Sequence, residues 1–324
     1  MNNYAASKPD PLSDMVALLK PRAVAYRVFS AHDGWSVRFP ASELVVFGQL
    51  ISGRCVIKRG DGPIVELVAG DFLLMGAPAS WVAGSSLGLP PVAFEDVIAD
   101  PGRLLSQDPD PVITRFMAGA FMFAMPNADL LSELFRPMMH IRGADIEAGH
   151  LRGLLAQLGD EALATRPGRS LILDRLLEII LVEAIRHRPA DEHVSAGVLA
   201  GIADPQIGGA LRMMHDDVRR PWTVGGLARG VGMSRSSFAA RFMGVLGLPP
   251  MAYLLRWRLT VAKAALSSSR RPMVEVADLA GYQSVSAFST AFSKATGSSP
   301  TAFRNASALR GSYGSAAGVQ AGNR

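Results

Sequence analysis

A pattern of apolar residues, glycine and proline occurs twice in the last third of this 324-residue chain. The first copy contains Leu227, Ala228, Gly232, Phe238, Phe242, Gly247, Pro250 and Tyr253, and the second contains Val276, Ala277, Gly281, Phe288, Phe292, Gly297, Pro300 and Phe303. The offset is 49 residues up to the glycine of the turn and 50 residues after it, so the second copy has one more residue in its turn. The repeat predicts two copies of one small folding unit.

Each copy is typical of a short helix, a glycine turn and a second helix. Gly232 and Gly281 stand where a helix ends in a left-handed residue, and Ser234 and Ser284 follow at the N-cap position of the next helix. Aromatic residues spaced i, i+4 then lie on one side of each second helix: Phe238 with Phe242, and Phe288 with Phe292. We therefore predict helix-turn-helix units at about 223–244 and 272–295.

A long apolar stretch joins the two copies. It begins at Pro249-Pro250 and runs to Leu266 with helical spacing. A helix there would hold the two units at a fixed separation. Two second helices can enter successive segments of the DNA major groove when they lie about 34 Å apart.

Charge is divided unequally along the chain. Residues 1–203 contain 18 Lys and Arg against 23 Asp and Glu, whereas residues 204–304 contain 13 against 5. A basic segment joined to an acidic one is expected when only one part binds a polyanion. A solvated basic face would give the same count, so charge alone leaves both interpretations open.

Residues 204–304 resemble the DNA-binding domain of the AraC/XylS family. The matching residues in the first half are Pro221-Trp222-Thr223-Val224, Leu227-Ala228, Gly232-Met233-Ser234-Arg235-Ser236, Phe242, Gly247, Pro250, Tyr253 and Trp257-Arg258. In the second half they are Gly281-Tyr282, Ser286-Ala287-Phe288, Ala291-Phe292, Gly297, Pro300 and Phe303-Arg304. The resemblance implies a transcription regulator, more an activator than a repressor, that binds promoter or operator DNA and contacts RNA polymerase.

The resemblance also implies which residues meet DNA. These are Arg235, Ser236, Ser237, Ala239, Ala240 and Arg241 in the first unit, and Gln283, Val285, Ser286, Ser289, Thr290 and Lys294 in the second. Two departures weaken base reading: Thr290 stands where the family usually has arginine, and Ala239-Ala240 offers only methyl groups. For Arg241 we expect a phosphate contact rather than a base contact, and Lys294 is also a candidate phosphate contact.

Short β-branched and aromatic runs between Ala23 and Gly84 predict a small barrel or a jelly roll. Gly60-Asp61-Gly62 is typical of a hairpin and Gly70-Asp71 of a tight turn. The segment resembles the cupin-like sensor domain that precedes such DNA-binding domains, on the opening Asp10-Pro11-Leu12-Ser13-Asp14, the Phe39-Pro40 step and the Gly70-Asp71 turn.

A metal site is not expected in this barrel. Gly48 and Trp81 stand near the positions where metal-binding cupins have histidines, and His32 alone among the six histidines lies in the strand region. We interpret His32 as a turn or surface residue. The single cysteine, Cys55, is expected to be a small strand residue that forms no disulfide.

Helical spacing returns between Asp145 and Arg188, with a break at Arg166-Pro167-Gly168. The second helix is apolar around much of its circumference. It either lies between the barrel and its partner helix or pairs with its twin in a homodimer, and we favour the dimer, through Leu173, Leu176, Leu177, Ile180 and Leu181.

Together these patterns predict an α+β multidomain protein. A cupin-like β-barrel sensor is expected at 1–144, a helical dimerisation segment at 145–188, a linker at 189–203, an all-α DNA-binding domain with two helix-turn-helix motifs at 204–304 and a disordered tail at 305–324. The barrel would sense a small molecule or partner, without a cofactor. The absence of a long apolar stretch and of a secretory signal predicts a cytoplasmic protein that joins the nucleoid when it binds DNA and does not enter a membrane.

Two other functions fit parts of the sequence. A cupin-type metalloenzyme with an accessory DNA-binding domain lacks the residues for its chemistry. An architectural DNA protein is disfavoured because two spaced second helices are suited to reading a sequence rather than to wrapping DNA.

Overall fold

The computed structural model describes residues 10–32, 34–42, 44–76, 79–100, 114–123, 134, 138–144, 149–187, 197–268 and 270–307. The chain divides into two compact units. We call the first the barrel unit: it contains all the strands with helices α2 (Phe94–Ala99), α4 (Gly149–Leu163) and α5 (Arg169–Arg186). The second, the helical unit, contains α1 (Pro11–Leu19) and α6 to α12.

Two five-stranded sheets form the barrel unit, as the cupin resemblance implies. One sheet has the order β1-β9-β3-β6-β10 and the other β5-β4-β7-β2-β8. The strands are β1 (Arg22–Ala31), β2 (Ser36–Phe39), β3 (Val45–Ser52), β4 (Arg54–Arg59), β5 (Ile64–Val68), β6 (Phe72–Met75), β7 (Trp81–Gly84), β8 (Val92–Ala93), β9 (Thr114–Met122) and β10 (Met139–Ile141). The predicted hairpin joins β4 to β5, and Cys55 lies buried in β4.

The predicted turn at Gly70-Asp71 is held by the Asp71 carboxylate. Asp71 accepts hydrogen bonds from the N–H of Val68 (3.1 Å) and the N–H of Gly143 (2.9 Å), and lies 2.8 Å from Nε2 of His140. Burial acts to raise the pKa of Asp71, but the hydrogen bonds from His140, Gly143 and Val68 outweigh it and leave the pKa below its ordinary value. The carboxylate thus fixes the turn to the residues that follow β10.

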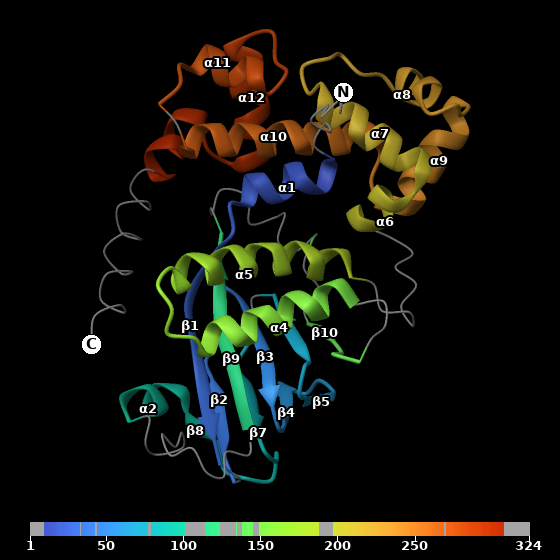
Figure 1. Cartoon of the computed structure of the whole chain (residues 1–324). Coiled ribbons are helices and arrows are strands. Elements are labelled where there is room, and N and C mark those ends of the chain that lie inside the picture. Colours follow the sequence, from blue (N-terminus) through green and yellow to red (C-terminus); the bar gives the residue numbers. More distant parts are fainter. Residues whose placement is uncertain are drawn as a thin grey trace. The chain divides into compact units, whose positions relative to one another are not determined.

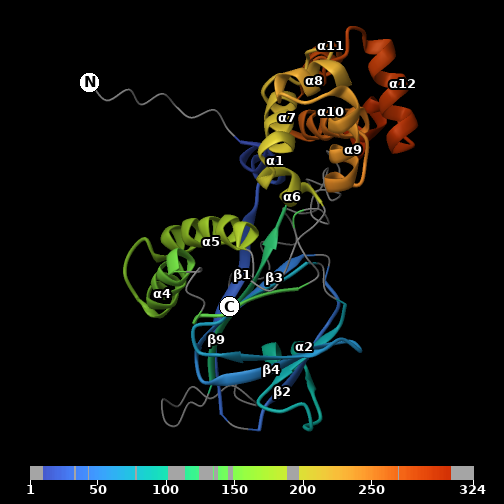
Figure 2. The ribbon, with the colours of Figure 1, turned by 90° about the vertical axis from the view of Figure 1, so that its right-hand side faces the viewer.

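Helices α4 and α5 lie side by side against the sheet that contains β1, β3 and β9 (Figures 1 and 2). The amide of Gln49 on β3 donates to the carbonyl of Leu155 on α4 at 2.6 Å, and the hydroxyl of Tyr26 on β1 donates to the carboxylate of Asp174 on α5 at 3.2 Å. The break between the helices falls at Gly168, as predicted.

The apolar circumference of α5 has a different cause from the one we favoured. The side chains of Leu173, Leu177, Ile180 and Leu181 are at most 1% exposed, because α5 packs against α4 on one side and β1 on another. These four residues belong to the interior of the barrel unit and are not available to a second copy. Leu176 is half-buried.

The end of the predicted linker is helical. Residues 198–203 form α6 (Val198–Ala203), which packs against α7 (Pro205–Asp216) and α9 (Arg235–Leu246). The N–H of Gly197 donates to the carbonyl of Val245 at 2.7 Å. The small residues that suggested a linker instead allow close helix packing. The remaining predicted linker, residues 189–196, lies outside the described residues, as does the predicted disordered tail from 308 onward; residues 305–307 are helical.

The first helix among the described residues, α1, belongs to the helical unit and not to the sensor domain predicted at 1–144. Asp10 caps α1 by accepting from the N–H of Ser13 at 3.0 Å. The side chains of Leu12, Met15 and Leu19, spaced i, i+3, i+7, are buried, and α1 packs against α6 and α7. The helical unit is therefore built from both an early and a late part of the chain.

Candidate nucleic-acid interface

The two predicted helix-turn-helix motifs are present in the helical unit. The first consists of α8 (Val224–Gly230) and α9, and the second of α11 (Met273–Leu279) and α12 (Val285–Thr296). Helix α10 (Pro250–Ser268) runs between them, as Figure 1 shows. We call α9 and α12 the recognition helices.

Local capping explains where the recognition helices begin. The hydroxyl of Ser234 accepts from the N–H of Ser237 at 3.2 Å, and Ser284 does the same for Ala287 at 3.2 Å. The turns before them contain Gly232 (φ +69°) and Gly281 (φ +74°), a conformation that favours glycine. The serine and glycine positions are those that the sequence predicted.

The aromatic residues of each recognition helix form the core of its motif. Phe238, Phe242, Phe288 and Phe292 are fully buried. In the first motif Phe242 meets the ring of Tyr253 from α10 with ring centroids 5.9 Å apart, and in the second Phe292 meets Phe303 at 5.4 Å. Burial of one side leaves the opposite side of each recognition helix facing solvent.

Most of the predicted DNA-contacting residues lie on this open side. Those with exposed side chains are Arg235, Ser236, Ser237, Ala240, Arg241, Gln283, Ser286, Thr290 and Lys294, whereas Ala239, Val285 and Ser289 are half-buried. The exposed set offers hydroxyl, amide, guanidinium and ammonium groups, which hydrogen-bond to base edges or phosphate oxygens.

Arg241 has a partner that the sequence did not reveal. Its Nε and Nη2 donate to the Asp204 carboxylate at 3.0 and 2.7 Å. Asp204 is also the N-cap of α7, since its other oxygen accepts from the N–H groups of Gln206 and Ile207. Burial acts to raise the pKa of Asp204, but these backbone N–H groups and Arg241 lower it overall. Arg241 thus joins the first recognition helix to α7.

Arginine contacts also connect the two motifs. Arg258 on α10 donates to the carbonyls of Val218 and Arg220, both at 3.0 Å, and Arg219 lies 3.1 Å from the carboxylate of Asp278 on α11. A Cβ atom added at Gly281 would lie only 2.5 Å from the carbonyl oxygen of Val218. The turn of the second motif therefore fits closely against the segment that precedes the first.

The barrel unit contains an apolar cavity of about 200 Å³. Gly48 and Trp81, which occupy positions where metal-binding cupins have histidines, both line it. Among the described residues no group of three His, Cys, Asp or Glu side chains is close enough to hold a metal ion. His32 is half-buried.

The part of the chain that the structure describes has no single helix with the length and hydropathy required to cross a membrane. Only α9 and α10 taken together pass that test, by length and composition, and they are bent by 55°.

Comparison with known proteins relates both units to protein families. Residues 10–188 match the family described as Cupin, and residues 227–306 match the family described as Helix-turn-helix domain. A putative AraC-like transcription regulator from Streptomyces lividans is 34% identical over 300 residues, and one from Streptomyces antibioticus is 31% identical over 299, each covering 91% of this chain and 98% of the relative. The RCS-specific HTH-type transcriptional activator RclR from Escherichia coli is 26% identical over 297 residues, covering 91% and 97%.

Proposed function

The chain belongs to the family of AraC-like transcription regulators, and from this premise we propose that it activates transcription at promoter DNA under the control of its barrel unit. It is a DNA-binding transcription regulator. The observation that carries the proposal is the pair of capped recognition helices, each with a buried aromatic side and an open polar side, joined by α10.

In the proposed mode of binding, the recognition helices enter successive segments of the major groove. Arg235, Ser236, Gln283, Ser286 and Thr290 then supply base contacts from their exposed positions. The excess of basic over acidic residues in 204–304 supplies attraction to phosphates, with Lys294 as one contact. Hydroxyl and methyl groups discriminate bases less sharply than a bidentate arginine, so we expect a moderately degenerate operator.

An activating role would require contact with RNA polymerase. The printed name of the Escherichia coli relative describes it as a transcriptional activator, which supports activation for this chain as well. We place the protein in the cytoplasm, on the nucleoid when bound. We propose no enzymatic activity, since the chain has regulators among its relatives along nearly its whole length.

We further propose that the protein forms a homodimer through the outer face of α5. Ile172 and Ile179 are 45% and 46% exposed, and with Leu176 they form an apolar stripe with i, i+4, i+7 spacing. The Arg175–Glu178 ion pair (2.7 Å) borders this stripe. Ile172→Arg should shift the protein from dimer to monomer in sedimentation experiments, whereas Leu171→Arg, which changes an even more exposed apolar residue off the stripe, should not.

A comparison of two DNAs tests the central proposal. The full-length protein should bind one promoter fragment, found by mapping its sites in its own genome, about 10³-fold or more tightly than random DNA at the same salt concentration. Equal binding to both DNAs would favour an architectural protein instead. Turnover of a substrate on addition of iron would favour the alternative of a cupin-type metalloenzyme.

A further inference from the structure

The cavity of the barrel unit is lined almost entirely by apolar residues. Residues of both sheets and of α2 line it. Among the described lining residues, all except Gln49 and Cys55 are aliphatic or aromatic. None of these residues has a formal charge. Burial raises the pKa of the Cys55 thiol to about 12, so this group is also neutral.

Aromatic rings are concentrated in two stacks on this wall. In the first, Phe116 lies between Phe29 (ring centroids 5.2 Å apart) and Trp35 (5.5 Å). In the second, Phe39 lies between Trp81 (3.9 Å) and Phe94 (4.9 Å). Flat aromatic surfaces of this kind bind another ring by stacking or by edge-to-face contact.

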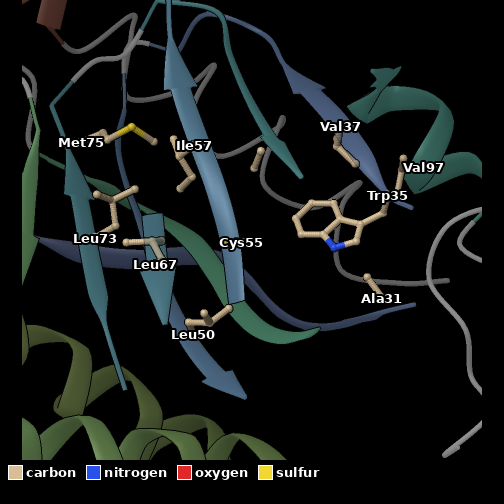
Figure 3. Packing of buried hydrophobic residues seen from close by; sticks show 11 residues of the cluster. Ala31, Trp35, Val37, Leu50, Cys55, Ile57, Leu67, Leu73, Met75 and Val97 are labelled. Carbon is tan, nitrogen blue, oxygen red and sulfur yellow. The ribbon is translucent and has the colours of Figure 1, made fainter. Parts of the chain in front are cut away.

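Among the described residues that line the cavity, Trp35 Nε1 and Gln49 Oε1 are buried side-chain atoms without a hydrogen-bond partner. The side chain of Gln49 points to α4, which leaves the indole of Trp35 as the donor on the cavity side. Trp35 is 2% exposed, and its indole N–H makes no hydrogen bond to any described residue. The indole extends from its backbone toward the centre of the cluster of buried side chains in Figure 3. A buried donor without an acceptor costs free energy that an acceptor on a ligand would recover.

We propose that this cavity binds a small, uncharged aromatic molecule with one hydrogen-bond acceptor, which receives the indole N–H of Trp35. The inference rests on the proposed sensing role of the barrel unit and names the chemical class of its effector. Sugars and carboxylates are disfavoured, because an apolar wall leaves their hydroxyl or charged groups without partners.

The size of the cavity fits one ring with a short substituent. An apolar cavity of about 150 Å³ is sufficient to hold benzene. The volume here is about 200 Å³, which leaves room for two or three further heavy atoms.

Gly48 gives a way to fill the cavity. Its neighbour Gln49 points outward to α4, so by strand alternation a side chain at 48 would point inward. A Cβ added there would meet nothing closer than the carbonyl oxygen of Met117 at 3.9 Å. Valine at this position therefore fits the backbone and occupies ligand space.

The test uses the full-length protein labelled with 5-fluorotryptophan, which gives four ¹⁹F signals from Trp35, Trp81, Trp222 and Trp257. The probes are acetophenone, its hydrocarbon analogue cumene, benzoate and a monosaccharide, and calorimetry gives the affinities. We expect acetophenone to bind most tightly and to shift the signals of Trp35 and Trp81. Tighter binding of benzoate or of the sugar would overturn the proposal.

Two variants test separately the hydrogen bond to the ligand and the space that the cavity offers it. Trp35→Phe keeps a ring but removes the N–H, so the affinity for acetophenone should fall about three- to tenfold while that for cumene is unchanged. Gly48→Val should abolish binding of both probes; if that variant fails to fold, Ala118→Val, on the neighbouring strand, replaces it. An equal loss of both probes in Trp35→Phe would overturn the assignment of the donor.

DNA binding measured in parallel separates this inference from the proposed function. If acetophenone binds as described but leaves promoter affinity unchanged at saturation, the ligand class stands and the sensing role fails. If no aromatic probe binds while promoter-specific binding remains, the ligand class is wrong and the regulator function stands.

Discussion

The carboxylate of Asp14 lies 3.1 Å from Nδ1 of His215, although the two residues are 201 positions apart in the sequence. The other ring nitrogen of His215 lies 2.8 Å from the hydroxyl of Tyr253, and the imidazole stacks on Trp257 with centroids 3.8 Å apart. His215 thus links α1 to α7 and α10 inside the helical unit.

This cluster predicts a pH dependence of stability. Burial lowers the pKa of His215 below 6.5, with Asp14 opposing the shift. Between the pKa of His215 in the folded state and its pKa of about 6.5 in the unfolded state, the unfolded protein binds one more proton than the folded protein. The contribution of His215 to the free energy of unfolding is therefore complete above about pH 6.5. It falls as the pH decreases through this range. Urea unfolding of the helical unit, followed by tryptophan fluorescence between pH 8 and 5, measures this loss.

The matched variants identify the titrating group. His215→Phe should flatten the dependence, whereas His150→Gln, which changes an exposed histidine in the barrel unit, should leave it intact. A wild-type protein that became more stable below pH 6.5 would contradict a neutral His215.

A second prediction separates the core of the recognition helices from their open side. Phe242→Ala and Phe292→Ala should each destabilise the helical unit by about 3–5 kcal/mol, because a buried aromatic side chain is lost, and should abolish binding to all DNA. Ser286→Ala and Thr290→Ala should leave the unfolding free energy unchanged and cost about 1–3 kcal/mol of operator binding where a base contact is well made. Equal losses on operator and random DNA would remove the base-reading role but not the fold.

Local sequence signals accounted for much of this architecture. The serine caps, glycine turns and paired phenylalanines of the two motifs depend on neighbours within a few residues, as do the hairpin after β4 and the turn at Asp71. Such local signals do not determine which helices and strands that are distant in the sequence pack together. Helix α1, whose apolar side is buried against α7, was not predicted from the sequence, and the apolar circumference of α5 fitted an internal helix as well as a dimer.

The role of Arg241 was missed for the same reason. Its position on the open side of a recognition helix suggested a phosphate contact, and no spacing rule connects it to Asp204, 37 residues earlier. The prediction of a linker at 189–203 likewise followed composition, whereas helix formation at 198–203 depends on the surfaces of α7 and α9.

A third prediction tests Arg241 against Asp204. Asp204→Ala removes both the α7 cap and the ion pair and should cost about 1–2 kcal/mol of stability. Arg241→Ala should cost less than about 1 kcal/mol, because its side chain is 47% exposed and the pair is screened by solvent. Salt titrations of DNA binding by Arg241→Ala test for a phosphate contact. If the slope of the logarithm of the binding constant against the logarithm of the salt concentration is unchanged, Arg241 has a structural role. If the slope is lowered by about one, Arg241 contacts a phosphate.

A fourth prediction contrasts two glycines of the helical unit. Gly281→Ala should destabilise it by at least about 1–2 kcal/mol, since alanine tolerates a positive φ poorly and the added Cβ would also meet the backbone of Val218. Gly244→Ala should stabilise it by about 0.5–1 kcal/mol, because this exposed glycine lies inside α9 with open space around it. Thermal unfolding of the two variants beside the wild type gives the sign of each effect.

Helix α1 precedes the barrel in the sequence and its partners follow the barrel, so α1 waits for those partners during synthesis. At about 5–20 residues per second, a ribosome makes His215 roughly 10–40 s after Asp14. Leu12, Met15 and Leu19 leave the exit tunnel long before their partners and remain uncovered while the whole barrel is translated. A nascent chain that is released early therefore lacks a finished DNA-binding unit, and the newly made protein gains it only after the whole barrel unit and then α6 to α12 have been synthesised.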